Sequence, residues 1–541
     1  MSSIRFRVVP LLCSAACVLV SCGGGSGSSP PAPQPDFTIA VSPTSLTAVE
    51  GGTSTVATFS IEAVNGFTGG AAVSISGLPP GATVNPAFPL AINAGSSQQF
   101  TIVTTDATPT GTAMLTAHAT SGSLAHDASL TLITGPVVKT SQQGTVLYLQ
   151  SHANGHTARI GLDTAWGGAI VEVSLDGINF VNAHDTGREV QPALYDAAAP
   201  YGAQCTQYGW DPVLAGDFYD HGSQVSSQSA VAASLYTKTI PVQWCPDQFG
   251  GGPGMTAPSD MSFEQTVTLA PGAALAFQLH LKLTHTGTDT HYNQSQEFPA
   301  VYVNSAYTTF VYYEGTSPWT NGAVSQAAAP ISPADVTAYT PEKWAALVDA
   351  SNQGLTVFVP SVYPSWHALS FPQSGGSGPT GDATVYMTPM TIFTIAPGAV
   401  IEGDIYLVPG DASAARSVVY ALHQQLTGPD IVAPIGTVDV PVANATLGGS
   451  GAQVAGWAFA ATAVAAVTVY VDGTAKGTAT LGTARPDVAA AYPNLAPPNS
   501  GWTYALDTTP LSNSTHVLEI RVTDTSGNEA TLLPIPITVS N

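Results

Sequence analysis

Polar and aromatic residues that a β-sheet core does not need gather in three segments near the middle of this 541-residue chain. The first segment begins at His184 and places Arg188 among an imidazole, carboxylates and the amide of Gln191. An arginine in this setting can hold a carboxylate or sugar hydroxyls through two hydrogen bonds. It can equally form a structural ion pair with Asp185 or Glu189, so the sequence leaves both roles open.

The second segment carries Tyr208, Trp210, Asp211, Asp217 and Asp220 within a loop-like stretch. Aromatic rings stack on the apolar face of a sugar, and carboxylates supply its acid, base or hydroxyl-binding groups. The pattern therefore predicts glycan contact. The three aspartates could instead bind a calcium ion, although the spacing of an EF-hand loop is absent. A solvated loop without a ligand is the third interpretation.

The third segment contains His285, Asp289, His291 and Glu297. The first three are separated by even numbers of residues, so an extended chain would place them on one face, which a zinc site requires but which does not establish one. We expect no metal or other cofactor from the sequence. Glu297 stands among amide and imidazole neighbours and is the predicted general acid or base, with a hydrogen-bonded structural carboxylate as the alternative.

These three segments and the aromatic residues after them define two predicted sets. The predicted catalytic residues are His184, Arg188, Asp211, Asp217 and Glu297. The predicted substrate-binding residues are Gln191, Tyr208, Trp210, His291, Tyr313 and Trp319.

The N-terminus has the features of an export signal. Arg5 and Arg7 precede an apolar run that is too short to span a membrane and that ends in Leu19-Val20-Ser21-Cys22. This ending resembles the lipobox of bacterial lipoproteins, which implies a signal peptide over residues 1–21, cleavage before Cys22 and acylation of that cysteine. Residues 22–35 form a Gly/Ser-rich and then Pro-rich tether. The alternative is an ordinary cleaved signal with an incidental cysteine.

Charge limits the expected partners. Lys and Arg total 12 against 35 Asp and Glu, for a formal net charge of -23. Such a surface repels polyanions, so we expect no nucleic-acid partner, and an acidic polysaccharide would need a local basic pocket. The resemblance to lipoproteins implies a place in the bacterial cell envelope, with membrane contact through the lipid alone. In that oxidising compartment Cys205 and Cys245 are predicted to form a disulfide.

Alternating apolar runs separated by Gly/Pro turns predict an all-β protein of three domains. Residues 36–134 contain no Lys or Arg and predict an immunoglobulin-like sandwich, similar to the Ig-like spacer modules of bacterial surface proteins. Residues 429–541 carry Gly456-Trp457-Ala458, Arg485-Pro486-Asp487 and Gly501-Trp502 and resemble a second bacterial Ig-like module. We predict that Trp457 and Trp502 are core residues, with a sugar-stacking platform as the alternative.

Residues 135–428 are too long for one simple sandwich and most resemble a galactose-mutarotase-like supersandwich. The predicted fold class is therefore all-β, with a central β-supersandwich flanked by two Ig-like β-sandwich domains. Two helices are also predicted in the central domain, one framed by Thr340 and Gly354 and one by Asp411 and Gly428.

These features predict an exported, lipid-anchored protein that cleaves a polysaccharide. A glycoside hydrolase would use Glu297 with Asp211 or Asp217, whereas a lyase would use His184 or a tyrosine as base, with Arg188 and Gln191 neutralising a uronate. Serine-hydrolase, zinc-protease and nucleotide-binding motifs are absent from the central domain. The alternatives are a non-catalytic glycan-binding or adhesion lipoprotein and a purely structural envelope component.

Overall fold

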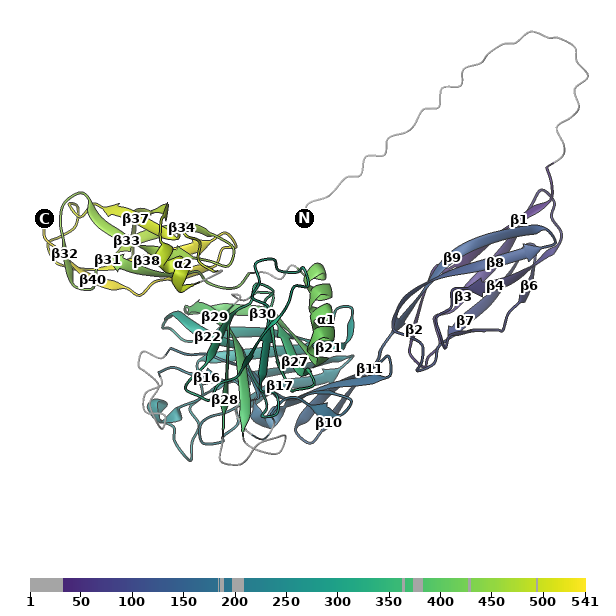
Figure 1. The fold of residues 1–541 in the computed structure, drawn as a ribbon, viewed down its shortest axis with the longest axis horizontal. Helices are drawn as coiled ribbons and strands as arrows, with labels where there is room; N and C mark the ends of the chain where they lie inside the picture. The colour runs from purple at the N-terminus through teal and green to yellow at the C-terminus, as the bar shows by residue number, and fades with distance from the viewer. Residues whose placement is uncertain are drawn as a thin grey trace, which may run out of the picture.

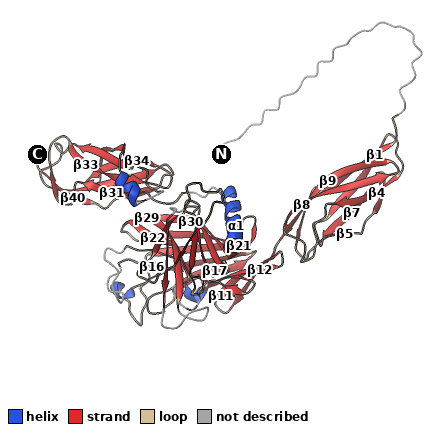
Figure 2. Cartoon of the chain, viewed as in Figure 1, coloured by secondary structure: helices blue, strands red, loops and turns tan. Residues whose placement is uncertain are grey.

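The computed structural model describes residues 33–182, 184, 189–196, 209–361, 365–372, 383–426, 430–492 and 495–541. Figure 2 shows that strands dominate these residues and that helices are few and short. The chain is therefore all-β, as its sequence predicts. Among the described residues, no helix is long and apolar enough to cross a membrane.

The N-terminal unit is a two-sheet sandwich (Figure 1). The alternation of apolar and polar residues sets its core: in β3, Ala57, Phe59 and Ile61 are buried while their neighbours are less so, and the Phe59 ring stacks on Phe100 at 4.0 Å. One sheet has the order β1 (Asp36–Ser42), β3 (Ala57–Val64), β7 (Ser96–Val103), β5 (Thr83–Asn85). The other has the order β2 (Ser45–Val49), β9 (Leu124–Gly135), β8 (Gly111–Ser121), β4 (Gly70–Ser76), β6 (Leu90–Asn93).

The central unit is built on a twelve-stranded and a nine-stranded sheet. The main path of the twelve-stranded sheet is β10 (Val137–Gln143), β11 (Val146–Ala153), β12 (His156–Asp163), β13 (Ala169–Leu175), β15 (Val190–Ala193), β22 (His291–Asn304), β29 (Thr384–Ile395), β28 (Ser365–Phe371), β25 (Val336–Tyr339). Short strands β14 (Ile178–Asn179), β16 (Pro212–Val213) and β19 (Val242–Gln243) pair beside this path.

The nine-stranded sheet has the order β17 (Gln224–Val231), β18 (Ser234–Ile240), β20 (Met261–Ala270), β21 (Ala273–His285), β30 (Val400–Asp411), β27 (Gln353–Phe358), β26 (Trp344–Val348), β23 (Thr309–Tyr312), β24 (Ser325–Ala328). Short 3-10 turns occur at η1 (Thr164–Trp166) and η3 (Pro246–Phe249). One apolar cluster, including Phe298 of β22 and Leu281 of β21, draws on both sheets, so they pack face to face. This arrangement is the predicted supersandwich.

Of the two predicted helices, one forms. Helix α1 (Ala412–Gln425) begins at Asp411, whose carboxylate accepts hydrogen bonds from the backbone of Ser413 and Ala414. Figure 1 shows it beside the strands of the nine-stranded sheet. The helix predicted from Thr340 to Gly354 is wrong. Residues 344–348 form β26 instead, because all five are buried inside the sheet between β23 and β27.

The C-terminal unit is a second two-sheet sandwich. Trp502 is 1% exposed, which confirms it as a core residue, whereas Trp457 is half-buried and packs against Phe459 and Tyr492. One sheet has the order β31 (Ile435–Val440), β33 (Ala452–Phe459), β37 (Gly501–Leu506), β36 (Thr480–Thr483). The other contains β32 (Ala445–Leu447), β40 (Ile535–Val539), β38 (Thr515–Asp524), β34 (Val464–Val471), β35 (Thr474–Thr478) and β39 (Glu529–Thr531), and helix α2 spans Pro486–Ala491.

Candidate functional site

Glu297 lies on the face of the twelve-stranded sheet that points away from the shared core. It pairs with Ala193 of β15 on one side and with Met390 of β29 on the other. The next residue, Phe298, is fully buried in the core cluster. Because successive strand residues point to opposite faces, Glu297 must face outward. We call this side of the sheet around Glu297 the outer face.

Tyr386 of β29 is a hydrogen-bond partner of Glu297. Its hydroxyl donates a hydrogen bond of 2.5 Å to Oε1 of Glu297. Burial raises the pKa of Glu297 to about 7, although hydrogen bonds with Tyr386 and Tyr195 pull it in the opposite direction. Burial and the neighbouring Glu297 charge raise the pKa of Tyr386 well above its usual value. Tyr386 therefore stays protonated, and Glu297 is the group of this pair that titrates near neutrality.

Aromatic rings surround this pair on the outer face. Tyr302 and Tyr386 lie with their ring centres 4.9 Å apart, and the ring of Phe371 on β28 lies 6.2 Å and 6.3 Å from the two of them. These rings form a small apolar cluster separate from the main core. Glu297 therefore lies beside a small aromatic cluster on the outer face.

The first predicted segment meets this face only in part. Glu189 is buried next to β15, and its backbone oxygen accepts from the backbone N–H of Tyr302. His184 is exposed, and its N–H donates to Asn182, whose own backbone binds Tyr302. Gln191 is buried and accepts from the backbone of Ala215, so it braces a loop, and we withdraw it from the substrate-binding set. Arg188 lies outside the described residues.

The second segment is folded into the protein. Asp217 is buried, with one oxygen accepting from the N–H groups of Tyr219 and His221 and the other 3.0 Å from the His221 ring. These bonds close the loop of Asp217 itself and occupy the oxygens that a calcium ion would need. Trp210 is 8% exposed, which is too little for a stacking platform, and Tyr208 lies outside the described residues. We therefore withdraw Asp217 from the catalytic set and Trp210 from the substrate-binding set.

Among the described residues of the central domain, Asp211 is the second carboxylate, after Glu297, with a raised pKa. It is buried, and burial raises its pKa to about 7 against the opposing effect of backbone hydrogen bonds from Cys245 and Trp244. Its Oδ2 has no hydrogen-bond partner. Within the part of the chain that the structure describes, no hydrogen bond joins Asp211 to Glu297. The two residues are separated by β15, so the predicted pair of catalytic carboxylates is not assembled in direct contact.

The third segment forms a tight cluster where β21 ends and β22 begins. His285, Asp289 and His291 each point one potential ligand atom into a region where all three atoms lie within 4.8 Å of one another. Both histidines are buried, and the Trp210 ring stacks on His291 at 3.7 Å. His291 is therefore not available to a sugar, and we withdraw it from the substrate-binding set. Among the described residues, this group is the one able to hold a metal.

Tyr313 and Trp319 lie in the loop between β23 and β24 of the nine-stranded sheet, against helix α1. The Tyr313 hydroxyl donates to the Ser317 backbone, and the Trp319 ring stacks on His423 of α1 at 3.5 Å. Both residues lie in or against the apolar cluster under α1. They fix the helix to the sheet and do not meet Glu297, so we withdraw them from the substrate-binding set.

A buried ion pair that the sequence does not predict lies in this same region. Arg416 of α1 donates from Nε and Nη2 to the two oxygens of Glu342, at 3.2 Å and 3.0 Å. Burial acts to raise the pKa of Glu342, but hydrogen bonds from Arg416, Tyr420, Trp344 and the Trp319 backbone outweigh it and the pKa is lowered. The signal in the sequence was weak, because Glu342 was assigned to the start of a helix that does not form.

Cys245 is buried and disulfide-bonded. Cys205, its predicted partner, and Cys22, the predicted lipid anchor, both lie outside the described residues. The pairing of Cys205 with Cys245 stays a prediction.

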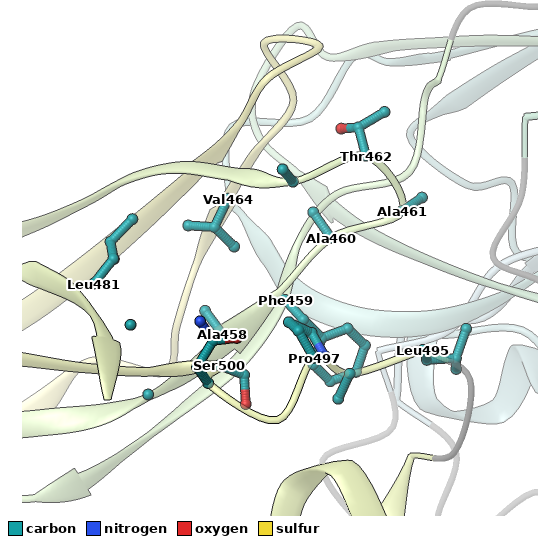
Figure 3. A pocket seen from close by; sticks show the side chains of 15 residues that line it. Ala458, Phe459, Ala460, Ala461, Thr462, Val464, Leu481, Leu495, Pro497 and Ser500 are labelled. Carbon is teal, nitrogen blue, oxygen red and sulfur yellow. The ribbon is translucent and has the colours of Figure 1, made fainter. Parts of the chain in front are cut away.

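A cavity of about 630 Å³ opens in the C-terminal unit, far along the chain from these residues (Figure 3). The figure shows Leu481, Val464, Pro497 and Leu495 around it, with Thr462 and Ser500 as polar neighbours. Its lining holds no charged side chain. The described lining of this cavity therefore supplies no charged group for acid–base catalysis.

Comparisons with known proteins do not assign an activity to this chain. No protein-family model and no curated protein matches the chain. A polysaccharide lyase structure aligns over 71% of this chain and 46% of its own length, with 8% identity and a TM-score of 0.28. The fibronectin(III)-like modules of Clostridium thermocellum CbhA align over 38% of this chain and 84% of theirs, with 13% identity and a TM-score of 0.14. A tetra-tandem repeat of a large adhesion protein aligns over 92% and 99%, with 11% identity and a TM-score of 0.14. The alignments are too loose to transfer an activity.

Proposed function

We propose that this protein cleaves a polysaccharide at the outer face of the twelve-stranded sheet, with Glu297 as the proton-transfer residue. The observation that carries the proposal is the Glu297 carboxylate, whose pKa burial raises to about 7 while it accepts from Tyr386. A group with a pKa near the working pH can both donate and accept a proton during a reaction. Glu297 can then protonate a leaving glycosidic oxygen or remove a proton from substrate or water.

Tyr386 acts in this proposal as a positioning residue. Its pKa lies well above the ordinary value, so its hydroxyl remains a donor and holds the Glu297 carboxylate in one orientation. A tyrosinate base of the lyase type is therefore disfavoured at this position. The partly exposed ring of Phe371, which packs on Tyr302 and Tyr386, offers apolar surface for a sugar ring near the carboxylate.

The proposal includes the location inferred from sequence. Export, cleavage before Cys22 and acylation would place the central domain outside the membrane on the tether of residues 22–35. An envelope enzyme in this position meets polymeric substrate directly. Replacing Cys22 with alanine is expected to move the protein from the membrane fraction to the soluble fraction, and equal membrane association of variant and parent would contradict the anchor.

The test of the activity is a panel of neutral and acidic polysaccharides incubated with the full chain, with reducing ends and unsaturated products measured separately. The two assays distinguish hydrolysis from elimination. Glu297→Gln is expected to lower turnover by about 10²- to 10⁴-fold, the usual contribution of general acid–base catalysis. The matched control is Glu402→Gln, which removes an exposed glutamate of the other sheet and is expected to retain parental turnover.

Two results would overturn the proposal. Full turnover by Glu297→Gln would remove the residue on which it rests. Saturable glycan binding by the parent without any product, unchanged by Glu297→Gln, would favour the alternative of a non-catalytic glycan-binding lipoprotein.

A further inference from the structure

The loop between β21 and β22 carries its chain from the nine-stranded to the twelve-stranded sheet, and a histidine stands at each end of it. His285 is the last residue of β21 and His291 the first of β22. They are 1% and 3% exposed, whereas the Asp289 side chain between them is 64% exposed. The two imidazoles thus face inward, and the carboxylate covers them from the solvent side.

The donor atoms are spaced as metal ligands are. His285 Nε2 lies 3.5 Å from one oxygen of Asp289, and His291 Nε2 lies 3.9 Å from the other. These separations are too long for good hydrogen bonds. Metal–ligand bonds of about 2.0–2.1 Å in a tetrahedron put neighbouring donor atoms about 3.3 Å apart, close to what is observed. His291 Nε2 is buried with no hydrogen-bond partner.

The outer nitrogens of both rings are already engaged. His285 Nδ1 lies 3.0 Å from the backbone oxygen of Ala396, and His291 Nδ1 lies 2.7 Å from Oδ2 of Asp196. Both partners are acceptors, so each Nδ1 donates to its partner, and Nε2 is the ring nitrogen on the side of Asp289. Metal-binding histidines are oriented in this way, with the second nitrogen donating to a carboxylate or carbonyl.

A second aspartate, Asp260, lies next to this group of three. Asp260 places Oδ2 3.3 Å from His285 Nε2, and its Oδ1 accepts from the Trp210 ring N–H at 2.7 Å. The same Trp210 ring stacks on His291 with an interplanar angle of 15°. The Trp210 ring therefore covers one side of the cluster and contacts both His291 and Asp260. With Asp196, Asp260 and Asp289, three carboxylates lie around the two imidazoles.

We propose that His285, His291 and Asp289 bind one divalent transition-metal ion, and that this ion is zinc. Two imidazole nitrogens with a carboxylate suit zinc, whereas calcium takes six to eight oxygen ligands. The dication offsets the charge of the nearby carboxylates. The ligands come from the end of β21, the start of β22 and the loop between them, so the ion ties the two sheets together at one edge.

The site also touches the proposed active face through the chain. Asp196, which orients His291, follows Tyr195, whose hydrogen bond lowers the pKa of Glu297. Gln296 binds both the N–H and the oxygen of the Tyr195 backbone. The ion therefore has a structural role, stabilising the loop that reaches Glu297. Zinc binding does not depend on the proposed cleavage of a glycan, and its test needs no substrate.

The test begins with the full chain purified without a histidine tag or chelator and analysed for metals by mass spectrometry. One equivalent of zinc per chain is expected. Chelation should lower the melting temperature, and added zinc should restore it. Cobalt replacing zinc should give the intense visible absorption of a four-coordinate site.

Asp289→Asn is the diagnostic variant, because this side chain is exposed and its replacement leaves the fold intact. It should lose the metal at least tenfold more readily on dialysis and lose the cobalt spectrum. Asp335→Asn is the matched control, since Asp335 is another exposed aspartate paired with one histidine, His367, and it should bind metal as the parent does. Absence of zinc in the parent with no thermal response to added zinc, or unaltered metal binding by Asp289→Asn, would overturn the proposal.

Discussion

Glu342 and Glu297 of the central domain lie in opposite electrostatic surroundings. Glu342, in the turn before β26, is bound by Arg416, and its pKa is lowered despite burial. Glu297, on β22, is bound by a neutral tyrosine, and burial raises its pKa to about 7. A carboxylate that is held charged by a cation serves the fold. A carboxylate whose pKa lies near neutrality can both donate and accept a proton, and this property has some cost to the stability of the fold.

The largest effect is expected at the cation. Arg416→Ala leaves Glu342 buried and charged without its partner and should lower the free energy of unfolding by about 3–5 kcal/mol. Urea unfolding at neutral pH measures it. Lys238→Ala, which breaks the more exposed ion pair with Glu264, is the control and should cost no more than about 1 kcal/mol. Equal losses in the two variants would mean that Glu342 does not depend on Arg416.

The next effect is a pH dependence of stability with the opposite sign to that of an ion pair. The folded pKa of Glu297 is raised above the unfolded value of 4.5, so its contribution is fully present below pH 4.5 and is lost as pH rises through about 7. This loss amounts to at most about 3 kcal/mol. Glu297→Gln should remove that part of the dependence, as shown by unfolding free energies measured between pH 5 and 8.

Asp211 gives this measurement an internal check. Its pKa is also raised to about 7, so the parent should show two contributions of the same sign. Asp211→Asn should remove one of them and leave the other. If neither substitution changes the slope of stability against pH, burial does not hold these carboxylates near neutrality.

Much of this comparison was open to sequence analysis and part of it was not. The alternating apolar runs and the turn clusters predict the all-β sandwiches. The amide and imidazole residues near Glu297 in the sequence predict that it acts as a general acid or base. Its partner Tyr386 lies 89 residues further on and meets it only because β29 pairs with β22. Strand pairing of this kind is set by the tertiary fold, and an apolar run such as residues 384–395 carries no local sign of it.

The incorrect expectations share a physical cause. The sequence predicts substrate contact for Trp210, His291, Tyr313 and Trp319, because aromatic and imidazole groups in polar stretches are typical of sugar-binding loops. The structure packs each of them against another part of the chain. Composition shows what a loop carries, whereas burial depends on which strands and helices later cover it.

The hydroxyl of Tyr386 offers a smaller perturbation of the same site. Tyr386→Phe removes a donor that lowers the pKa of Glu297, so that pKa should move further upward. Loss of a hydrogen bond to a charged group should cost about 1–3 kcal/mol of stability above neutral pH. The pH at which turnover changes by half should rise with it, while Tyr302→Phe, which retains the donor to Glu297, should leave that midpoint in place.

The smallest effect is expected for a glutamate that is neither buried nor poised. Glu402 of β30 lies 3.6 Å from Lys282, and both side chains are exposed by more than 40%. Water solvates the charge at this position whether or not the lysine is near, so Glu402→Gln should change the unfolding free energy by less than about 1 kcal/mol. Its slope of stability against pH between 5 and 8 should match that of the parent. A changed slope would show that any glutamate of this domain alters the titration. An unchanged slope, beside a flattened one in Glu297→Gln, would assign the effect to the sheltered position of Glu297 on the outer face.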